Sequence, residues 1–175
     1  EVSRSLQVGM DPAVVTLRGL RTLLGATNAD GGFAVFCDHT AELLEIVAAQ
    51  GLSQRFLDEA GKVLDLLRQV IDSREGVLID NIHQDPRATG EIWRCEGLRS
   101  VIIMPLIYKD RAGEAQVQGA IILGCRRAGR FSEVDFELTQ AAARQLALIV
   151  RQAEFFASEK RQAGSLAALY RMSHE

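Results

Sequence analysis

Residues 100–108, SVIIMPLIY, and residues 117–125, VQGAIILGC, are the two strongest β-strand patterns in the chain. A polar turn that contains Gly113 joins them, as between neighbouring strands of an antiparallel sheet. Both runs are almost continuously apolar, which is typical of strands that are covered on both faces. We therefore expect this pair in the middle of a sheet with helices on its two sides.

The N-terminal part of the chain predicts one helix and two more strands. Asp11-Pro12 is typical of a helix start, and apolar residues at helical spacing follow it as far as Leu24. Residues 33–38 and 43–49 are apolar and β-branched runs on either side of a short polar turn. They predict an antiparallel hairpin.

The middle of the chain predicts a helix, a strand and a short helix. Residues 54–73 have the apolar spacing of one helix with a wide buried face, and residues 77–80 predict a short strand. Thr89 is placed to cap a short helix that carries Trp93. With a long C-terminal helix, this order predicts an α+β fold in which helices flank an antiparallel sheet.

The C-terminal helix has a well-defined predicted start. Ser132 is typical of an N-cap, and Asp135 stands three residues later, where the carboxylate of a capping box belongs. Phe131 and Phe136 have the spacing of a hydrophobic staple. The helix is therefore expected to begin directly after Ser132.

From there a heptad pattern predicts a coiled coil. One set of residues recurs at every seventh position, and a second set lies four places after three of them: Ala142, Ile149, Phe156, Ala163 and Tyr170, and Leu146, Ala153 and Ala167. Lys160 and Gly164 weaken the pattern. The far half of the helix is expected to pair with a second copy of the chain, as a homodimer. The alternative is a packed helix to about Phe156 with a frayed, solvated end.

Composition and charge narrow the class of protein. The chain has 175 residues, of which 47% are hydrophobic and 25% charged, as in one globular domain with appendages. A net charge of -3 gives no reason to expect a nucleic-acid partner. The three cysteines form no close pair and no metal-ligand spacing, which favours a reducing, cytoplasmic compartment. The apolar runs are too short to span a bilayer, although a longer parent protein could carry membrane segments elsewhere.

The order of elements and several short motifs together resemble a GAF domain, the small-molecule sensory module of many signalling proteins. The motifs are VAAQGL (47–52), VLID (77–80) with DPR (85–87), SVIIMPL (100–106), GAIILG (119–124) and FSEVD (131–135). The resemblance covers residues 11–151. It implies a GAF-like (PAS-like) fold whose ligand pocket lies on one face of the sheet, under the segment between the third and fourth strands.

The same resemblance nominates eight ligand-binding residues: Val77, Ile79, Trp93, Arg94, Cys95, Arg99, Ser100 and Met104. Trp93 is of a type that stacks on a planar ligand, and Arg99 of a type that holds an anionic group. The alternatives are that Trp93 belongs to the core and that Arg99 is an ordinary surface charge. The continuous apolar runs leave open which strand face points toward the pocket.

The last ten residues, LAALYRMSHE (166–175), resemble the start of the phosphoacceptor box of sensor histidine kinases. By this resemblance His174 accepts a phosphoryl group from ATP and Glu175 is the general base. The alternative is a solvated histidine on an exposed helix. Nothing in the chain resembles a nucleotide lid, so ATP is expected to enter only through a downstream domain, and the partner of such a kinase is a response regulator.

These resemblances divide the chain into an N-terminal linker (1–10), a GAF sensory domain (11–151), and a signalling helix with the start of a dimerisation and phosphoacceptor domain (152–175). The expected function is coupling of small-molecule or redox input, through the C-terminal helix, to autophosphorylation of a histidine. The alternative is a GAF regulatory or dimerisation module of a cyclase, a phosphatase or a transcription regulator.

The cysteines and histidines decide whether the sequence predicts a bound cofactor or an enzymatic activity. No covalent chromophore is expected, because Arg94 and Glu96 stand beside Cys95 where bilin-binding relatives usually have a histidine. Haem would need an axial ligand such as His83 or His39. His83 lies next to the Asp85-Pro86 turn and is more simply interpreted as a loop histidine. Free methionine sulfoxide reductases are GAF domains with three redox cysteines, but Cys37, Cys95 and Cys125 are far apart in sequence. The ligand therefore stays unidentified at this point.

Overall fold

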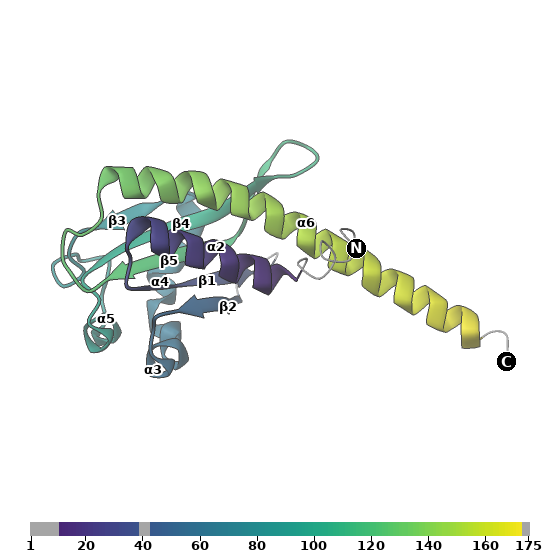
Figure 1. The fold of residues 1–175 in the computed structure, drawn as a ribbon, viewed down its shortest axis with the longest axis horizontal. Helices are drawn as coiled ribbons and strands as arrows, with labels where there is room; N and C mark the ends of the chain where they lie inside the picture. The colour runs from purple at the N-terminus through teal and green to yellow at the C-terminus, as the bar shows by residue number, and fades with distance from the viewer. Residues whose placement is uncertain (1–10, 39–42, 173–175) are drawn as a thin grey trace.

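A computed structural model describes residues 11–38 and 43–172, and it contains a single antiparallel sheet in that part of the chain (Figure 1). The five strands are β1 (Gly31–Cys37), β2 (Leu44–Gln50), β3 (Val77–Ile79), β4 (Ser100–Lys109) and β5 (Ala115–Cys125). Their order across the sheet is β2-β1-β5-β4-β3. The expected hairpin and the central position of the strongest strand pair are both confirmed, since β5 lies in the middle with β4 beside it.

Helices cover both faces of this sheet. The long helices α2 (Pro12–Thr27) and α6 (Glu133–Met172) lie side by side on one face (Figure 1). The opposite face carries four shorter elements: α3 (Gln54–Asp58), the 3₁₀ helix η1 (Ala60–Val63), α4 (Leu64–Ser73) and α5 (Glu91–Glu96). The predicted α+β class is confirmed.

Two local predictions are wrong. The single helix expected over residues 54–73 is broken into α3, η1 and α4. Ala60 and Val63 are both buried, and a 3₁₀ turn places residues three apart on the same side, while Gly61 lowers helix propensity at the break. The cap of α5 is Gly90, with a φ of 141° and no side-chain hydrogen bond, instead of Thr89.

The alternation of β4 decides the face that the sequence left open. Val101 and Ile103 point into the core under α3, α4 and α5, whereas Ile102 and Met104 point into the core under α2 and α6. The edge strand β3 follows the same rule, because its register pairs Ile79 with Val101. Successive apolar residues from Val101 to Met104 and from Val77 to Ile79 therefore alternate between two separate apolar cores.

Helix α6 begins as predicted. The Asp135 carboxylate accepts hydrogen bonds from the Ser132 backbone N–H (2.8 Å) and hydroxyl (2.9 Å), and Ser132 Oγ accepts one from the Asp135 N–H (3.2 Å). Phe131 and Phe136 belong to the same apolar core. With 40 residues, α6 is about 60 Å long and extends well past the sheet (Figure 1).

The predicted heptad positions divide between two environments. Leu146 packs in the core between the sheet and α2 of the same chain, so it does not face a partner, and Ala153 is also buried. Ile149 and Tyr170 are exposed. The side chains of Phe156, Lys160, Ala163 and Ala167 lie outside the described part of the chain. Within that part, no helix is long and apolar enough to cross a membrane.

Candidate ligand-binding site

The segment between β3 and β4 covers a tightly packed aromatic core. The ring centroids of Phe33 and Phe56 are 5.8 Å apart, and those of Phe56 and Trp93 are 5.9 Å apart. Trp93 is 1% exposed and packs in the core between the sheet and the short helices. The indole therefore belongs to the core, the alternative that the sequence left open, and presents almost no surface for stacking.

The other nominated residues are not brought together at one place. Val77 and Ile79 pack against the same core as Trp93, but Met104 lies on the opposite face of the sheet, among residues that contact α2 and α6. The buried Ser100 hydroxyl donates to the Arg127 carbonyl oxygen at 2.7 Å.

Three of the nominated residues have exposed side chains, and they are Arg94, Cys95 and Arg99. Arg99 holds the local backbone in place, since its N–H donates to the Cys125 carbonyl at 2.8 Å and its carbonyl accepts from Ile82 at 2.6 Å. His174 and Glu175 lie outside the described residues.

A polar pocket of about 350 Å³ opens within the covering segment itself. We call it the roof pocket, and its lining is Ile82, His83, Asp85, Ala88, Thr89, Gly90, Glu91 and Arg94. Nε2 of His83 is buried and has no hydrogen-bond partner among the described residues. Sequence reasoning named Arg94 but dismissed His83 as a loop histidine, because only the fold shows that its ring nitrogen faces inward.

The charges around the roof pocket are partly neutralised. Arg87 forms two hydrogen bonds to the Asp85 carboxylate, at 2.9 and 2.6 Å, and this pairing holds the pKa of Asp85 below its usual value. Arg94 lines the pocket with an exposed guanidinium. His83 and Arg94 both line the roof pocket, and an imidazole and a guanidinium are side chains that suit a small polar or anionic ligand.

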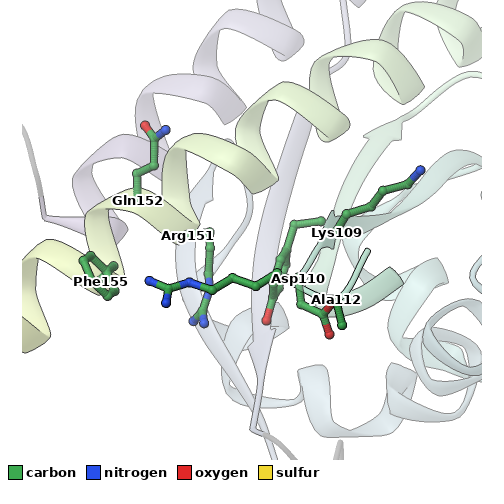
Figure 2. A pocket seen from close by; sticks show the side chains of 8 residues that line it. Lys109, Asp110, Ala112, Arg151, Gln152 and Phe155 are labelled. Atoms are coloured by element: carbon green, nitrogen blue, oxygen red, sulfur yellow. The ribbon is translucent and has the colours of Figure 1, made fainter. Parts of the chain in front are cut away.

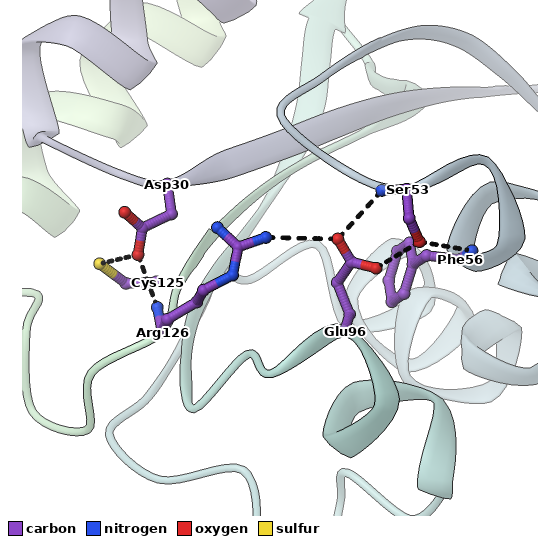
Figure 3. A network of polar contacts seen from close by, with 6 residues as sticks. All are labelled: Asp30, Ser53, Phe56, Glu96, Cys125 and Arg126. Atoms are coloured by element: carbon purple, nitrogen blue, oxygen red, sulfur yellow. Dashed lines mark hydrogen bonds and ion pairs between the residues drawn. The ribbon is translucent and has the colours of Figure 1, made fainter.

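A chain of polar contacts fastens the end of α5 to the rest of the domain (Figure 3). The Glu96 carboxylate accepts hydrogen bonds from the Ser53 N–H (3.0 Å) and hydroxyl (2.5 Å) and pairs with Arg126 at 3.4 Å. Ser53 Oγ in turn caps α3 by accepting from the Phe56 N–H at 3.1 Å. Because Phe56 contacts Trp93, this chain connects the surface of the domain to its aromatic core.

The same chain continues to the start of β1. The Asp30 carboxylate accepts from the Arg126 N–H at 2.7 Å and from the Cys125 thiol at 3.3 Å (Figure 3). The Arg126 hydrogen bond is the main reason why the pKa of Asp30 is lowered. One connected set of polar contacts thus joins the loop before β1, the end of β5, α5 and α3.

The three cysteines are free thiols on three different elements. Cys37 and Cys125 stand at opposite ends of the paired strands β1 and β5. Burial raises the pKa of both thiols, which disfavours the reactive thiolate. Cys95 is exposed on α5. Among the described residues, no group of three potential ligands is placed to hold a metal ion.

Comparisons with known proteins agree on the fold. A search of curated proteins finds no match. Among solved structures, a domain assigned to a two-component sensor histidine kinase of Sinorhizobium meliloti is 20% identical, with a TM-score of 0.62 over 82% of this chain and 92% of that one. A GAF domain/HD domain protein from Geobacter sulfurreducens is 18% identical, with a TM-score of 0.67 over 85% and 98%.

A third similar structure is the type II free methionine-R-sulfoxide reductase from Thermoplasma acidophilum, which is 16% identical with a TM-score of 0.60 over 78% of this chain and 90% of that one. At these identities the likeness extends to the fold alone. The profile of the GAF domain family, however, matches residues 10–151, which is most of the sequence. The chain therefore belongs to the GAF domain family.

Proposed function

We propose that this chain is the regulatory GAF domain of a sensor histidine kinase, and that it transmits small-molecule input through α6 to His174. The observation that carries the proposal is the continuity of α6. One helix begins at the Ser132 capping box, contacts the domain as far as Glu154, and runs on to Met172, the first residue of the Met-Ser-His-Glu sequence.

Strand β4 offers a direct connection between the ligand side and α6. Its residues Val101 and Ile103 pack in the core below the roof pocket, while Ile102, Met104 and Leu106 pack in the core that includes α6. Because packed interiors are stiff, a shift of β4 displaces side chains on both faces. Ligand binding at His83 and Arg94 would therefore bias the position of α6.

The outer surface of α6 supports pairing with a second copy of the chain. Its exposed apolar residues are Val134, Leu138, Leu148, Ile149, Phe155, Leu166, Leu169, Tyr170 and Met172. A helix that extends beyond its own domain with these residues exposed is stabilised when a partner covers them. We infer a homodimer in which the far halves of two α6 helices pair.

The proposed chemistry takes place at the end of this helix pair. A neutral imidazole nitrogen of His174 attacks the γ-phosphorus of ATP, the bond to the ADP oxygen breaks, and Glu175 takes the proton from the other ring nitrogen. The ATP-binding domain lies outside these 175 residues in this proposal. A response regulator would then receive the phosphoryl group.

Labelling of the full-length protein with γ-³²P-ATP tests the proposal. We expect acid-labile, base-stable label that is lost in His174→Gln. His39→Gln is the matched control, since it removes a different histidine of the chain, to which the proposal gives no role, and should leave the label in place. Label that survives His174→Gln, or a full-length protein that takes up no label, would refute the kinase role and leave a GAF module with another output.

A further inference from the structure

A second cavity lies on the other side of the sheet from the roof pocket, between the β4–β5 hairpin and α6. Its volume is about 940 Å³, within the range of roughly 300–1,000 Å³ that is common for small-molecule sites. We call it the hairpin pocket, and its lining is Tyr108, Lys109, Asp110, Arg111, Ala112, Arg151, Gln152 and Phe155. Figure 2 shows Arg151, Gln152 and Phe155 on α6, and Lys109, Asp110 and Ala112 on the hairpin across from them.

The residues that line the hairpin pocket carry a net positive charge, since Lys109, Arg111 and Arg151 outnumber the single carboxylate in the lining. That carboxylate, Asp110, is used by the turn: Oδ1 accepts from the Glu114 N–H at 2.9 Å, and Oδ2 accepts from the Gln116 amide at 3.2 Å. The hydrogen bond from Glu114 is the main cause that lowers the pKa of Asp110. The amine of Lys109 points away from Arg151 in Figure 2.

Two aromatic rings stand beside these guanidinium groups. The Arg151 guanidinium lies over the Tyr108 ring, 5.0 Å from its centroid. Its contact with Glu154 is long, at 3.9 Å, and the same Glu154 oxygen accepts from the Gln118 amide at 2.8 Å. Phe155 is 51% exposed, which leaves much of a large apolar ring uncovered. The pocket thus combines cationic guanidinium N–H donors with the exposed aromatic ring of Phe155.

We propose that the hairpin pocket binds a small planar aromatic anion, such as an aryl carboxylate or an aryl phosphate. The ring would pack against Tyr108 and Phe155, and the anionic group would accept hydrogen bonds from Arg111 and Arg151. Guanidinium groups recognise planar carboxylates and phosphates through paired N–H donors, and they also stack on aromatic faces. A neutral ring or a bare anion would make only half of these contacts.

The position of this pocket gives the ligand a direct effect on α6. Ala153 of α6 is completely buried, and the next residue, Glu154, accepts a hydrogen bond from Gln118 of β5 at 2.8 Å. A ligand held between the hairpin and residues 151–155 would fix the helix at the point where it leaves the sheet. This input is independent of the roof pocket and of any phosphorylation at His174.

Binding is tested by NMR titration of the ¹⁵N-labelled chain with 4-hydroxybenzoate. Benzamide serves as the probe for the ring alone, and inorganic phosphate as the probe for the anion alone. We expect saturable shifts of the amides of residues 108–112 and 151–155 with 4-hydroxybenzoate, and much weaker responses to the other two probes. Equal responses to all three, shifts centred elsewhere, or no saturation at millimolar concentration would overturn the proposal.

Single substitutions then locate the site. Arg111→Gln and Phe155→Ala should each weaken binding of 4-hydroxybenzoate about tenfold, since each removes one of the two interactions while both side chains are exposed and so dispensable for folding. Arg127→Gln removes an exposed arginine beyond the other end of β5 and should leave the affinity unchanged. Wild-type affinity in Arg111→Gln, or an equal loss in Arg127→Gln, would contradict a specific site.

Discussion

At the scale of single residues, Glu96 connects three parts of the domain. Its side chain is 7% exposed and its carboxylate joins the end of α5 to the cap of α3 and to Arg126 (Figure 3). A buried carboxylate with three partners stabilises a fold only while all three remain. The orientation of the segment between β3 and β4, which contains the roof pocket, therefore depends on the Glu96 side chain.

Glu96→Ala should lower the free energy of unfolding by about 2 kcal/mol, because the Ser53 N–H and the Arg126 guanidinium lose their acceptor. Urea denaturation followed by circular dichroism measures the change. Glu91→Ala is the matched control on the same helix, where the glutamate is exposed, and should change stability by less than about 0.5 kcal/mol. A loss for Glu96→Ala no larger than the control would show that the network does not hold the helices together.

Asp30 gives the stability of the domain a dependence on pH. Its pKa is lowered in the folded protein, mainly by the Arg126 N–H, so its contribution is present above the ordinary aspartate pKa of about 3.9 and is lost as the pH falls through the folded value. Asp30→Asn should therefore reduce the loss of stability below about pH 4. Urea midpoints between pH 6 and pH 3 measure this slope. The control is Asp72→Asn, which changes an exposed aspartate and should leave the dependence of the urea midpoint on pH unaltered. The same dependence in Asp30→Asn and the wild type would contradict the prediction.

At the scale of elements, α6 combines a packed half with a projecting half. The packed half is stabilised by its contacts with β4 and α2. Beyond Phe155 the described side chains are exposed, so helix propensity and pairing decide the stability there. Gly164 is the weakest residue of this half by propensity, and a Cβ at that position would meet no other atom within 4 Å.

Gly164→Ala should stabilise the projecting half by about 1 kcal/mol and slow hydrogen exchange of the amides around residue 164 about fivefold. The same substitution at Gly25, which has equal space in α2, is the control and should leave the exchange of α6 unchanged. Unaltered exchange in Gly164→Ala would mean that this part of α6 is not helical in solution.

Elements that depend on local signals could be predicted from the sequence, and elements that depend on tertiary packing could not. The Ser132 capping box is a local motif and is present as predicted. The break at Gly61 could not be predicted, because an apolar pattern that fits a helix also fits a shorter helix with a 3₁₀ turn. Met104 was placed with Trp93 because a continuous apolar strand does not show which face each residue occupies.

The roof and hairpin pockets were missed for a related reason. His83 comes from a loop, and only the fold shows that its Nε2 is buried without a partner. Arg111 and Phe155 are 44 positions apart in the sequence. No local sequence pattern relates a hairpin turn to the middle of a long helix. Charged residues in turns are ordinarily solvated, so nothing in the sequence pattern singles out Arg111.

At the scale of the whole molecule, the domain and the projecting helix predict an elongated dimer. Leu166 is 67% exposed on the far half of α6, and Leu166→Glu should shift the chain toward monomer in sedimentation equilibrium by placing two like charges at the helix pair. Ala168→Glu adds the same charge about 200° further around the helix and should leave the dimer intact. Equal dissociation by both variants, or a wild-type chain that remains monomeric, would contradict pairing through this face.

The proposed transmission through α6 is tested most directly by the rate of His174 phosphorylation in full-length proteins with residues inserted between Glu159 and Lys160. Seven residues add one complete heptad, whereas four rotate the heptad phase by about 50°. We predict a rate near that of the wild type for the seven-residue insertion and a rate at least about fivefold higher or lower for the four-residue insertion. Equal rates for the two insertions would contradict the proposal that α6 carries the signal.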